Sequence, residues 1–349
     1  MSLKKKKGLA GSSLGDLINA GFDGETILDV KNLHVCYHTV DDDVLAVNGV
    51  DLTLKKGESL GIVGETGAGK TTLALSVMGL LPRRVGEVTD GSITFMGVPL
   101  VEADEKLMRQ VRGDRISMIF QDPMTSLNPT MTVGDQILEV LKLHNKFDDP
   151  ESRVDEILKL VGIEPSRKIC YPHQFSGGMK QRIVIAMALA CEPDLLIADE
   201  PTTALDVTIQ SQVLAMIGDI QEKLGTSLIL ITHDLGVVAE TCDKVCVMYA
   251  GEIVEYGTLE QVFDKNLEHH PYTTGLFNCI PDLASDKARL DPIPGLTADP
   301  AHLPDGCYFS PRCSRCTDEC RSKHPAKHRL PNGQMISCNL CSGGTEAQS

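Results

Sequence analysis

The sequence predicts an α/β fold in which a mostly parallel sheet is covered by helices, followed by a small cysteine-rich C-terminal extension. Short apolar runs alternate with segments of helical spacing, and a glycine-rich loop joins one such pair. After Pro271 the apolar periodicity fades and cysteines accumulate. We expect a flexible N-terminal lead over residues 1–26, the main domain over residues 27–264 and the extension over residues 265–349.

Hydrophobic patterning predicts the individual elements. Buried strands are expected at Ser59–Val63, Ile116–Phe120, Leu195–Ala198 and Leu228–Ile231. Helices are expected at Lys70–Leu81, Thr132–Lys146, Glu151–Gly162, Gly178–Cys191 and Val207–Leu224. A closing hairpin is expected from Val245–Val247 and Ile253–Tyr256. Strands and helices that alternate in this way are typical of a parallel sheet with helices on its faces.

Composition argues against several classes of function. The 349 residues carry 48 acidic and 33 basic side chains, and this net charge of −15 argues against a general nucleic-acid binder. No apolar stretch approaches the roughly 18–20 residues that cross a bilayer. The lead also lacks the continuous apolar run of a signal peptide. A role at a membrane would therefore require docking on another subunit that crosses it.

A phosphate-binding loop is predicted at Gly64-Glu65-Thr66-Gly67-Ala68-Gly69-Lys70-Thr71, which satisfies G-x-x-x-x-G-K-[ST] between a strand and a helix. The glycines let backbone N–H groups wrap phosphates, and the helix N-terminus favours their negative charge. Lys70 is expected to reach the β- and γ-phosphates, and the Thr71 hydroxyl to ligate magnesium. We therefore expect ATP and Mg²⁺ as cofactors, with Thr72 also among the nucleotide contacts.

Polar residues at the ends of other predicted strands are further candidates for the nucleotide and magnesium site. Asp199 can hold magnesium through water, and Glu200 can polarise the attacking water. His233 follows the strand at Leu228–Ile231 and can hydrogen-bond the γ-phosphate, although a lone histidine is usually structural and its role depends on a family resemblance. Gln121 follows the strand at Ile116–Phe120 and can contact both magnesium and the attacking water. The catalytic candidates are therefore Glu200, His233 and Gln121, and the magnesium candidates are Thr71, Gln121 and Asp199.

The segment Ser176-Gly177-Gly178-Met179-Lys180-Gln181-Arg182 decides the class of phosphate-binding protein. It resembles the signature of ATP-binding-cassette proteins, and the order of motifs along the chain matches that family as well. The order runs Gly64–Thr71, Gln121, Ser176–Gln181, Asp199-Glu200, Ala204-Leu205-Asp206 and His233. The resemblance implies a nucleotide-binding domain with a P-loop core, an antiparallel β subdomain and a helical subdomain.

The resemblance also implies that two cassettes pair head to tail, with two nucleotides sandwiched at their interface. Ser176, Gly177 and Gly178 would then contact the γ-phosphate bound by the opposite subunit, and Asp206 is counted among the nucleotide-binding residues. Physical chemistry agrees, because a helix N-terminus preceded by Ser-Gly-Gly is an anion site with no phosphate of its own. An aromatic residue stacks on adenine in this family. Tyr37 occupies the matching position, and His38 is the alternative.

Longer matches narrow the resemblance to the ATPase subunits of dipeptide and oligopeptide permeases, over nearly all of residues 27–341. The matching segments are Phe120–Pro129, His173–Met179 and His270–Thr273. The resemblance implies an importer with two membrane-spanning subunits, a second ATPase that is identical or not, and an extracytoplasmic substrate-binding protein. It implies that the chain lies on the cytoplasmic face of the membrane, where the segment after Gln121 receives the coupling helix of a membrane subunit.

Six of the twelve cysteines follow the spacing Cys307-x5-Cys313-x2-Cys316-x3-Cys320-x17-Cys338-x2-Cys341. In a reducing cytosol such a group favours a metal site over disulfides. Four thiolates suit either zinc or a [4Fe–4S] cluster. The resemblance selects Cys307, Cys313, Cys320 and Cys338 and implies the iron–sulfur cluster. The C-x-x-C pairs formed with Cys316 and Cys341 suit zinc equally well, so both metals remain open.

Three functions remain open at this stage. The first is ATP hydrolysis that powers import of dipeptides or oligopeptides, with nickel or another small solute as the alternative cargo. The second is a soluble ATP-driven switch acting on nucleic acid or ribosomes, against which the single cassette and the acidic balance both argue. The third is a regulator in which the C-terminal cysteines sense redox state and govern the ATPase.

Overall fold

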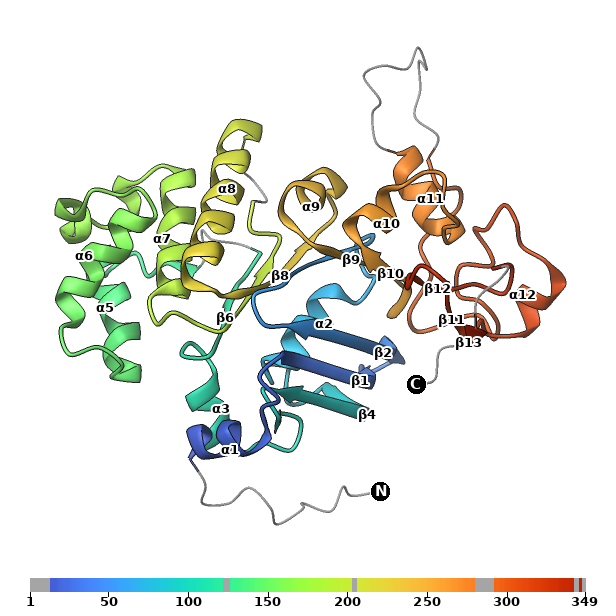
Figure 1. The fold of residues 1–349 in the computed structure, drawn as a ribbon, viewed down its shortest axis with the longest axis horizontal. Coiled ribbons are helices and arrows are strands. Elements are labelled where there is room, and N and C mark those ends of the chain that lie inside the picture. Colours follow the sequence, from blue (N-terminus) through green and yellow to red (C-terminus); the bar gives the residue numbers. More distant parts are fainter. Residues whose placement is uncertain (1–12, 122–125, 203–205, 280–291, 342–344, 347–349) are drawn as a thin grey trace.

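The structure is a computed structural model that describes residues 13–121, 126–202, 206–279, 292–341 and 345–346. Ala204, Leu205 and positions 122–125 of the predicted coupling segment lie outside the described residues. The described chain forms two sheets with helices around them (Figure 1). Among the helices described, none has both the length and the apolar composition to cross a membrane.

The larger sheet has nine strands in the order β13-β11-β12-β10-β9-β3-β8-β7-β6. Their bounds are β3 Ser59–Val63, β6 Ile116–Ile119, β7 Leu195–Asp199, β8 Ser227–Thr232, β9 Lys244–Tyr249, β10 Glu252–Thr258, β11 Lys327–Arg329, β12 Met335–Ser337 and β13 Thr345–Glu346. The run from β9 to β6 is parallel. Every residue of β3, β7 and β8 is buried, which explains their unbroken apolar sequences.

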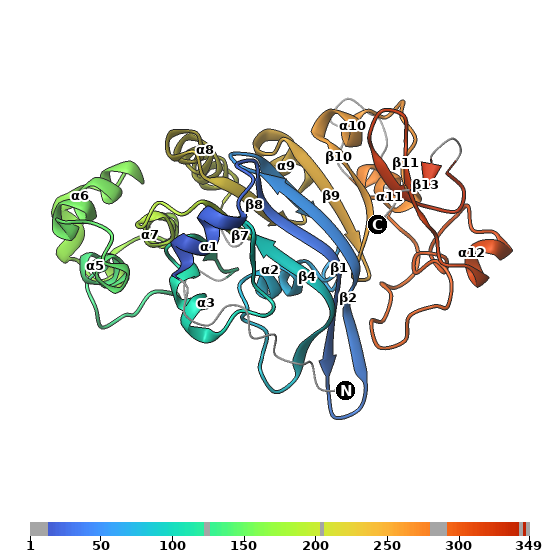
Figure 2. The same cartoon turned by 60° about the horizontal axis from the view of Figure 1, so that its bottom comes forward.

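The smaller sheet is antiparallel, with the order β2-β1-β4-β5. Its strands are β1 Thr26–His38, β2 Asp43–Lys55, β4 Gly86–Phe95 and β5 Val98–Pro99. β1 and β2 form a long hairpin (Figure 2). The apolar faces of this sheet and of the larger sheet share one core, in which Leu28, Leu54 and Ile93 pack with Leu60 and Ile62 of β3.

Helices cover the faces of the larger sheet and form a separate group at one end. They are α1 Leu14–Gly21, α2 Lys70–Val77, α3 Glu105–Val111, α5 Val133–His144, α6 Pro150–Leu160, α7 Gly177–Leu189, α8 Val207–Leu224, α9 Leu235–Thr241, α10 Leu259–Phe263, α11 Pro271–Asn278 and α12 Asp318–Ser322. Two short 3₁₀ helices, η1 Pro165–Ile169 and η2 Pro172–Gln174, precede α7. In both overall views α5 and α6 lie at the opposite end from α12.

Two local predictions need correction. The helix expected over Lys70–Leu81 ends at Val77, because Gly79 adopts a left-handed φ of 59° that stops the helix. The lead expected to be flexible contains α1, which Ser13 caps by accepting a hydrogen bond from the N–H of Asp16. Leu14 and Ile18 of α1 are buried in the same core as the smaller sheet, so this part of the lead is helical and packed.

The extension shares its core with the rest of the chain. β12 pairs with β10, and β11 and β13 continue the same sheet outward. Tyr272 of α11 and Phe309 belong to the hydrophobic cluster that also contains Val247 of β9 and Val63 of β3. Residue 264 therefore marks a change in sequence character, although the packing continues across it.

Candidate nucleotide site

The loop Gly64–Thr71 connects β3 to α2, as its motif predicts. Gly69 has a left-handed φ of 95°, and a side chain there would place Cβ 2.3 Å from the carbonyl oxygen of Ala46. A Cβ on Gly64 would lie 2.2 Å from the carbonyl oxygen of Met248. Both positions therefore require glycine, because neighbouring backbone occupies the space of any side chain. This close packing brings the loop against β2 and β9.

Lys70, the first residue of α2, points back into the loop. Its side chain is buried, and Nζ donates to the carbonyl oxygens of Gly64 at 2.7 Å and Glu65 at 3.0 Å. Burial lowers the pKa of Lys70, against the opposing effect of the carboxylates of Glu200, Asp199 and Glu65. The ammonium group thus lies under the influence of three carboxylates, and an incoming phosphate would give it a stronger partner than the loop carbonyls.

Thr71 and Asp199 form the pair predicted to hold magnesium. The Thr71 hydroxyl donates to Asp199 Oδ2 at 2.8 Å, from the start of α2 to the end of β7. Asp199 is 2 % exposed, and burial raises its pKa while the bond from Thr71 and the charge of Lys70 lower it. A hydroxyl and a carboxylate at one point are hard oxygen ligands of the kind that Mg²⁺ prefers.

Glu200 is contacted by both other catalytic candidates. Gln121 Nε2 donates to Glu200 Oε2 at 3.1 Å, and His233 Nδ1 lies 3.2 Å from Oε1. The backbone N–H of Glu200 donates to the carbonyl oxygen of Ile231 at 2.8 Å, which anchors it to β8. The structure therefore brings Gln121, Glu200 and His233 together from β6, β7 and β8, next to the Thr71–Asp199 pair.

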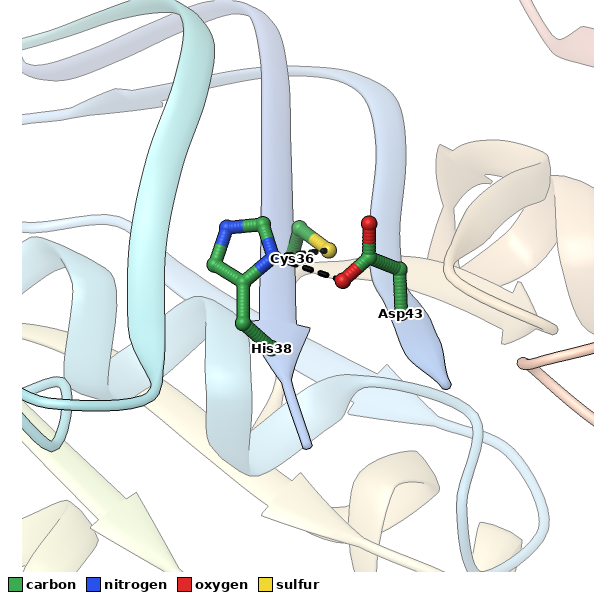
Figure 3. Close-up of side chains that lie close together, drawn as sticks. All are labelled: Cys36, His38 and Asp43. Atoms are coloured by element: carbon green, nitrogen blue, oxygen red, sulfur yellow. Dashed lines mark hydrogen bonds and ion pairs between the residues drawn. The ribbon is translucent and has the colours of Figure 1, made fainter. Parts of the chain in front are cut away.

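Tyr37 lies at the edge of this site. It is half-buried, and its hydroxyl donates to Thr72 Oγ1 of α2 at 3.3 Å. Beside it, Cys36, His38 and Asp43 meet near the turn that joins β1 to β2 (Figure 3). His38 Nδ1 lies 2.7 Å from Asp43 and 3.9 Å from Cys36, and His38 pairs directly with Asp43 across the strands. Strand pairing accounts for this contact. Because both partners use the same ring nitrogen, the three residues form no proton relay.

The signature segment forms the N-terminus of α7. Ser176 caps the helix by accepting from the N–H of Met179 at 3.4 Å, and Ser176 and Gly177 are exposed. A Cβ on Gly177 would meet no atom within 4 Å, whereas one on Gly178 would lie 2.6 Å from Ile209 of α8. Asp206 caps α8 by accepting from the N–H of Ile209 at 3.0 Å. The exposed end of α7 is thus open to a ligand from outside this chain.

The four cysteines selected at the sequence level are electrostatic neighbours in the extension. Burial, together with the thiols of Cys338, Cys320 and Cys313, raises the pKa of Cys307 to about 12. Cys316 and Cys341 are also neighbours of this group, since Cys316 acts on the pKa of Cys313 and Cys338 on that of Cys341. Cys341 also bonds to Glu268, and Cys316 donates to the carbonyl oxygen of Thr317 at 3.4 Å. In the described part of the chain, no three of the six sulfurs lie within 4.8 Å of one another.

Sequence reasoning missed the contacts that the extension makes with the phosphate-binding loop. Arg312 donates to both carboxylate oxygens of Glu65, and the hydroxyl of Tyr272 accepts from the N–H of Glu65. Arg312 immediately precedes Cys313, and Tyr272 lies in the segment His270–Thr273 that carried part of the resemblance. In the sequence, these neighbouring motifs were the available indications of a role for Arg312 and Tyr272. Neither motif indicated a contact with the phosphate-binding loop.

Comparisons with known families match both parts of the chain. The profile of the ABC transporter family matches residues 47–203. The profile of the oligopeptide/dipeptide transporter C-terminal region matches residues 254–320. The first match contains the phosphate-binding loop, the signature and the acidic end of β7, and the second contains α11 and the first four of the clustered cysteines.

Individual relatives are similar over nearly their whole length. The chain is 50 % identical to the dipeptide transport ATP-binding protein DppD of Bacillus subtilis, over 90 % of this chain and 95 % of the relative. It is 48 % identical to the oligopeptide transport ATP-binding protein OppD of Haemophilus influenzae, over 90 % of this chain and 97 % of the relative.

Solved structures are similar to the cassette part. One is the dimeric structure of a post-hydrolysis state of the ATP-binding cassette MJ0796 bound to ADP and Pi, with 26 % identity and a TM-score of 0.60 over 67 % of this chain and 99 % of that one. Another is cbiO1 from Clostridium perfringens, part of an ABC transporter complex, with 32 % identity and a TM-score of 0.61 over 69 % of this chain and 92 % of that one.

Proposed function

The chain belongs to the ABC transporter family, among the ATP-binding subunits of dipeptide and oligopeptide transporters, and from this premise we propose how its residues hydrolyse ATP to power peptide import. It is an ATPase subunit of an ABC importer. The names of its relatives support peptides as cargo over nickel, and support transport over a soluble switch.

The observation that best supports this proposal is the position of two groups of polar side chains. The pair Thr71–Asp199 and the group Gln121, Glu200 and His233 lie together where β6, β7 and β8 end. We assign the phosphates of ATP to the loop Gly64–Thr71, where Lys70 would exchange its loop carbonyls for phosphate oxygens. Thr71 and Asp199 would hold magnesium, with Gln121 beside them. The metal would neutralise charge on the β- and γ-phosphates.

Glu200 is the residue that activates water in this proposal. Its carboxylate would accept a hydrogen bond from the water and orient it toward the γ-phosphorus. Gln121 and His233 already contact its two oxygens, so they would keep the carboxylate in place and complete the γ-phosphate contacts. Tyr37, next to Thr72, would stack on adenine.

The assembly follows from the open end of α7. ABC transporter membership implies dimerisation and a membrane partner, and we propose that Ser176, Gly177 and Gly178 contact the γ-phosphate bound by the opposite ATPase. Asp206 would lie at the same interface. We further propose two membrane-spanning subunits, a second ATPase and an extracytoplasmic substrate-binding protein, with this chain at the cytoplasmic face of the membrane.

Reconstitution tests this function. The chain, assembled with its partner ATPase and membrane subunits in vesicles, should hydrolyse ATP and accumulate a dipeptide supplied with its binding protein. Lys70→Ala should abolish both activities because the phosphates lose their buried cation. Peptide accumulation that persists in this variant would reassign the nucleotide site, and nickel accumulation without peptide accumulation would reassign the cargo.

We also propose that Cys307, Cys313, Cys320 and Cys338 hold a [4Fe–4S] cluster. The thiols of Cys338, Cys320 and Cys313 all act on the pKa of Cys307, so the four side chains form one electrostatic group. Four cysteine thiolates are the ligands of a [4Fe–4S] cluster, with zinc as the rival metal for the same ligand set. The cluster would cross-link a segment with few apolar residues, so its role in this proposal is structural.

Metal analysis with matched cysteine variants tests this assignment. Protein purified without oxygen should be brown and contain about four irons per chain. Cys320→Ser should lose the iron, whereas Cys316→Ser and Cys341→Ser should retain it. Colourless protein with stoichiometric zinc, or equal iron loss in all three variants, would reject it.

A further inference from the structure

Glu65, the second residue of the phosphate-binding loop, is held on all sides. Its two carboxylate oxygens accept from Nη1 and Nη2 of Arg312 at 2.6 and 3.0 Å. Its N–H donates to the hydroxyl of Tyr272 at 2.8 Å, and its carbonyl oxygen accepts from Lys70 at 3.0 Å. The N–H of Ala68 donates to the same carbonyl oxygen at 3.1 Å. Every polar atom of Glu65 therefore has a partner, and two of the four partner residues, Arg312 and Tyr272, come from the extension.

Arg312 is itself rigidly placed. Its side chain is 5 % exposed, and Nε donates to the carbonyl oxygen of Pro294 at 3.0 Å. The guanidinium carbon lies 5.7 Å from the ring centre of Tyr249 and 6.0 Å from that of Phe309. A guanidinium fixed in this way presents its fork in one orientation, so the bidentate contact restrains both the position and the direction of the Glu65 side chain.

Tyr272 is part of the same unit. It is fully buried, and its ring centre lies 4.7 Å from Tyr249 and 5.4 Å from Phe309. Tyr249 ends β9, beside the loop, whereas Tyr272 and Phe309 belong to the extension. These three rings therefore fix the extension against the sheet at the point where the hydroxyl of Tyr272 meets the loop backbone.

A turn in the cysteine-rich segment positions Phe309 and Arg312 next to the phosphate-binding loop. The N–H of Ser310 donates to the carbonyl oxygen of Cys307 at 2.9 Å, and the N–H of Arg312 donates to that of Phe309 at 3.0 Å. Phe309 and Arg312 thus project from a tight turn whose two ends are Cys307 and Cys313. The geometry of this turn decides whether Arg312 reaches Glu65.

We propose that the C-terminal extension sets the nucleotide affinity of the phosphate-binding loop, with Arg312 and Tyr272 as positioning residues that act through Glu65. The inference rests on the proposed nucleotide site at Gly64–Thr71. Phosphate binding needs several loop N–H groups aimed inward together. A loop restrained at Glu65 loses less conformational freedom when the phosphates bind, and the affinity rises accordingly.

Equilibrium binding of a fluorescent ATP analogue to the full chain tests the proposal. Arg312→Lys keeps the positive charge and loses the bidentate fork, and Glu65→Gln keeps the shape and loses the charge. Each should raise the nucleotide Kd on the order of tenfold. The double variant should be no weaker than either single variant, because both remove the same contact. Tyr272→Phe should raise Kd as well, since the Glu65 N–H loses its acceptor.

A matched control separates positioning from general stability. Arg115 forms a half-buried ion pair with Asp194 at 2.6 Å, at the far end of the parallel strands from the loop. Arg115→Lys should lower the melting temperature without changing Kd. In the assembled importer, Arg312→Lys should raise KM for ATP and leave kcat nearly unchanged.

The outcomes distinguish this inference from the function on which it rests. Nucleotide binding that persists in Lys70→Ala contradicts the proposed nucleotide site. Loss of binding in Lys70→Ala, with wild-type Kd in Arg312→Lys and Glu65→Gln, overturns the positioning role alone. Additive effects in the double variant, or an equal rise of Kd in Arg115→Lys, also overturn it.

Discussion

Glu200 combines an unusual backbone with a crowded side chain. Its φ of 46° lies in the left-handed region that residues with a side chain rarely adopt. Strain of this kind costs on the order of 1–3 kcal/mol and persists where the surroundings over-determine it. Here the bond to Ile231 holds the backbone, and Gln121 and His233 contact the carboxylate. The strained backbone thus occurs where the Glu200 carboxylate meets the two other catalytic candidates.

Replacing Glu200 by Gln tests its role directly. The variant should bind ATP normally and hydrolyse it about 10²–10⁴ times more slowly, because an amide cannot accept the water's proton. Single-turnover hydrolysis with a parallel binding measurement checks this expectation. Hydrolysis near the wild-type rate would move the role elsewhere, with His233 as the first candidate.

His270 carries a second prediction at the residue scale. It is 1 % exposed, and burial lowers its pKa to about 3 from 6.5. Its Nδ1 accepts from the N–H of Tyr272, so the folded state needs the neutral ring. Below pH 6.5 the unfolded state binds a proton that the folded state does not. The stabilising contribution is therefore complete above that pH and is lost as pH falls toward 3.

The variant His270→Asn isolates this effect, since Asn also caps helices and does not titrate. Urea unfolding at pH 7.5 and pH 5 should show that the wild type loses about 2 kcal/mol more than the variant on acidification. His269, whose pKa is raised by its bond to Glu255, is present in both proteins and cancels in the difference. Equal losses would contradict the prediction.

At the scale of elements, the body and the first turn of α7 lie in different surroundings. Its body packs in the core through Ile183, Val184 and Leu189, and its first turn is exposed. Gly178 is required by its contact with Ile209, whereas Gly177 faces open space. Packing therefore constrains Gly178, whereas the proposed γ-phosphate contact of Gly177 can be altered without disturbing the packing.

The variant Gly177→Asp tests the proposed phosphate contact of Gly177 without altering the packing at Gly178. An acidic residue in the first turn suits the helix dipole, so the melting temperature should change little. ATP binding to the variant's own loop should also persist. Hydrolysis should fall on the order of 10²-fold, because the new charge repels the γ-phosphate across the dimer interface. Melting, nucleotide binding and ATPase assays on one preparation check all three. Unchanged ATPase activity would show that this end of α7 contacts no phosphate.

At the scale of the molecule, the extension completes the cassette. β12 covers the edge of β10, and Gln334 and His269 are bonded to Glu255, which is fully buried. Tyr272 and Phe309 fill the core against Tyr249. Without the extension, β10 would expose an unpaired edge and Glu255 would lose its partners.

A chain that ends at residue 264 should therefore fail to form a stable monomer. Removing an aromatic side chain from a core costs about 3–5 kcal/mol, and two such losses consume most of the 5–15 kcal/mol that stabilises a typical domain. Size-exclusion chromatography and thermal unfolding should show aggregation, whereas a chain that ends at residue 346, and so keeps β13, should melt as the full chain does. A soluble truncated monomer with wild-type melting would refute this account.

Features set by nearby residues could be predicted from sequence. The loop Gly64–Thr71 and the start of α7 depend on glycine positions a few residues apart, and β3, β7 and β8 depend on unbroken apolar runs. The predicted end of α2 was wrong, because the conformation of Gly79 decides it. The expectation that the whole lead is flexible was also wrong, because burial of Leu14 and Ile18 stabilises α1. The metal assignment of the cysteines stays a prediction.

The sequence by itself determined the α/β class, the order of motifs and the chemistry available at each strand end, because these depend on local spacing and side-chain type. Only the tertiary structure decided which distant groups meet. Gln121 reaches Glu200 across 79 positions, and Arg312 reaches Glu65 across 247. Such contacts depend on strand order and on the path of the extension around the sheet, and local patterning carries no record of either.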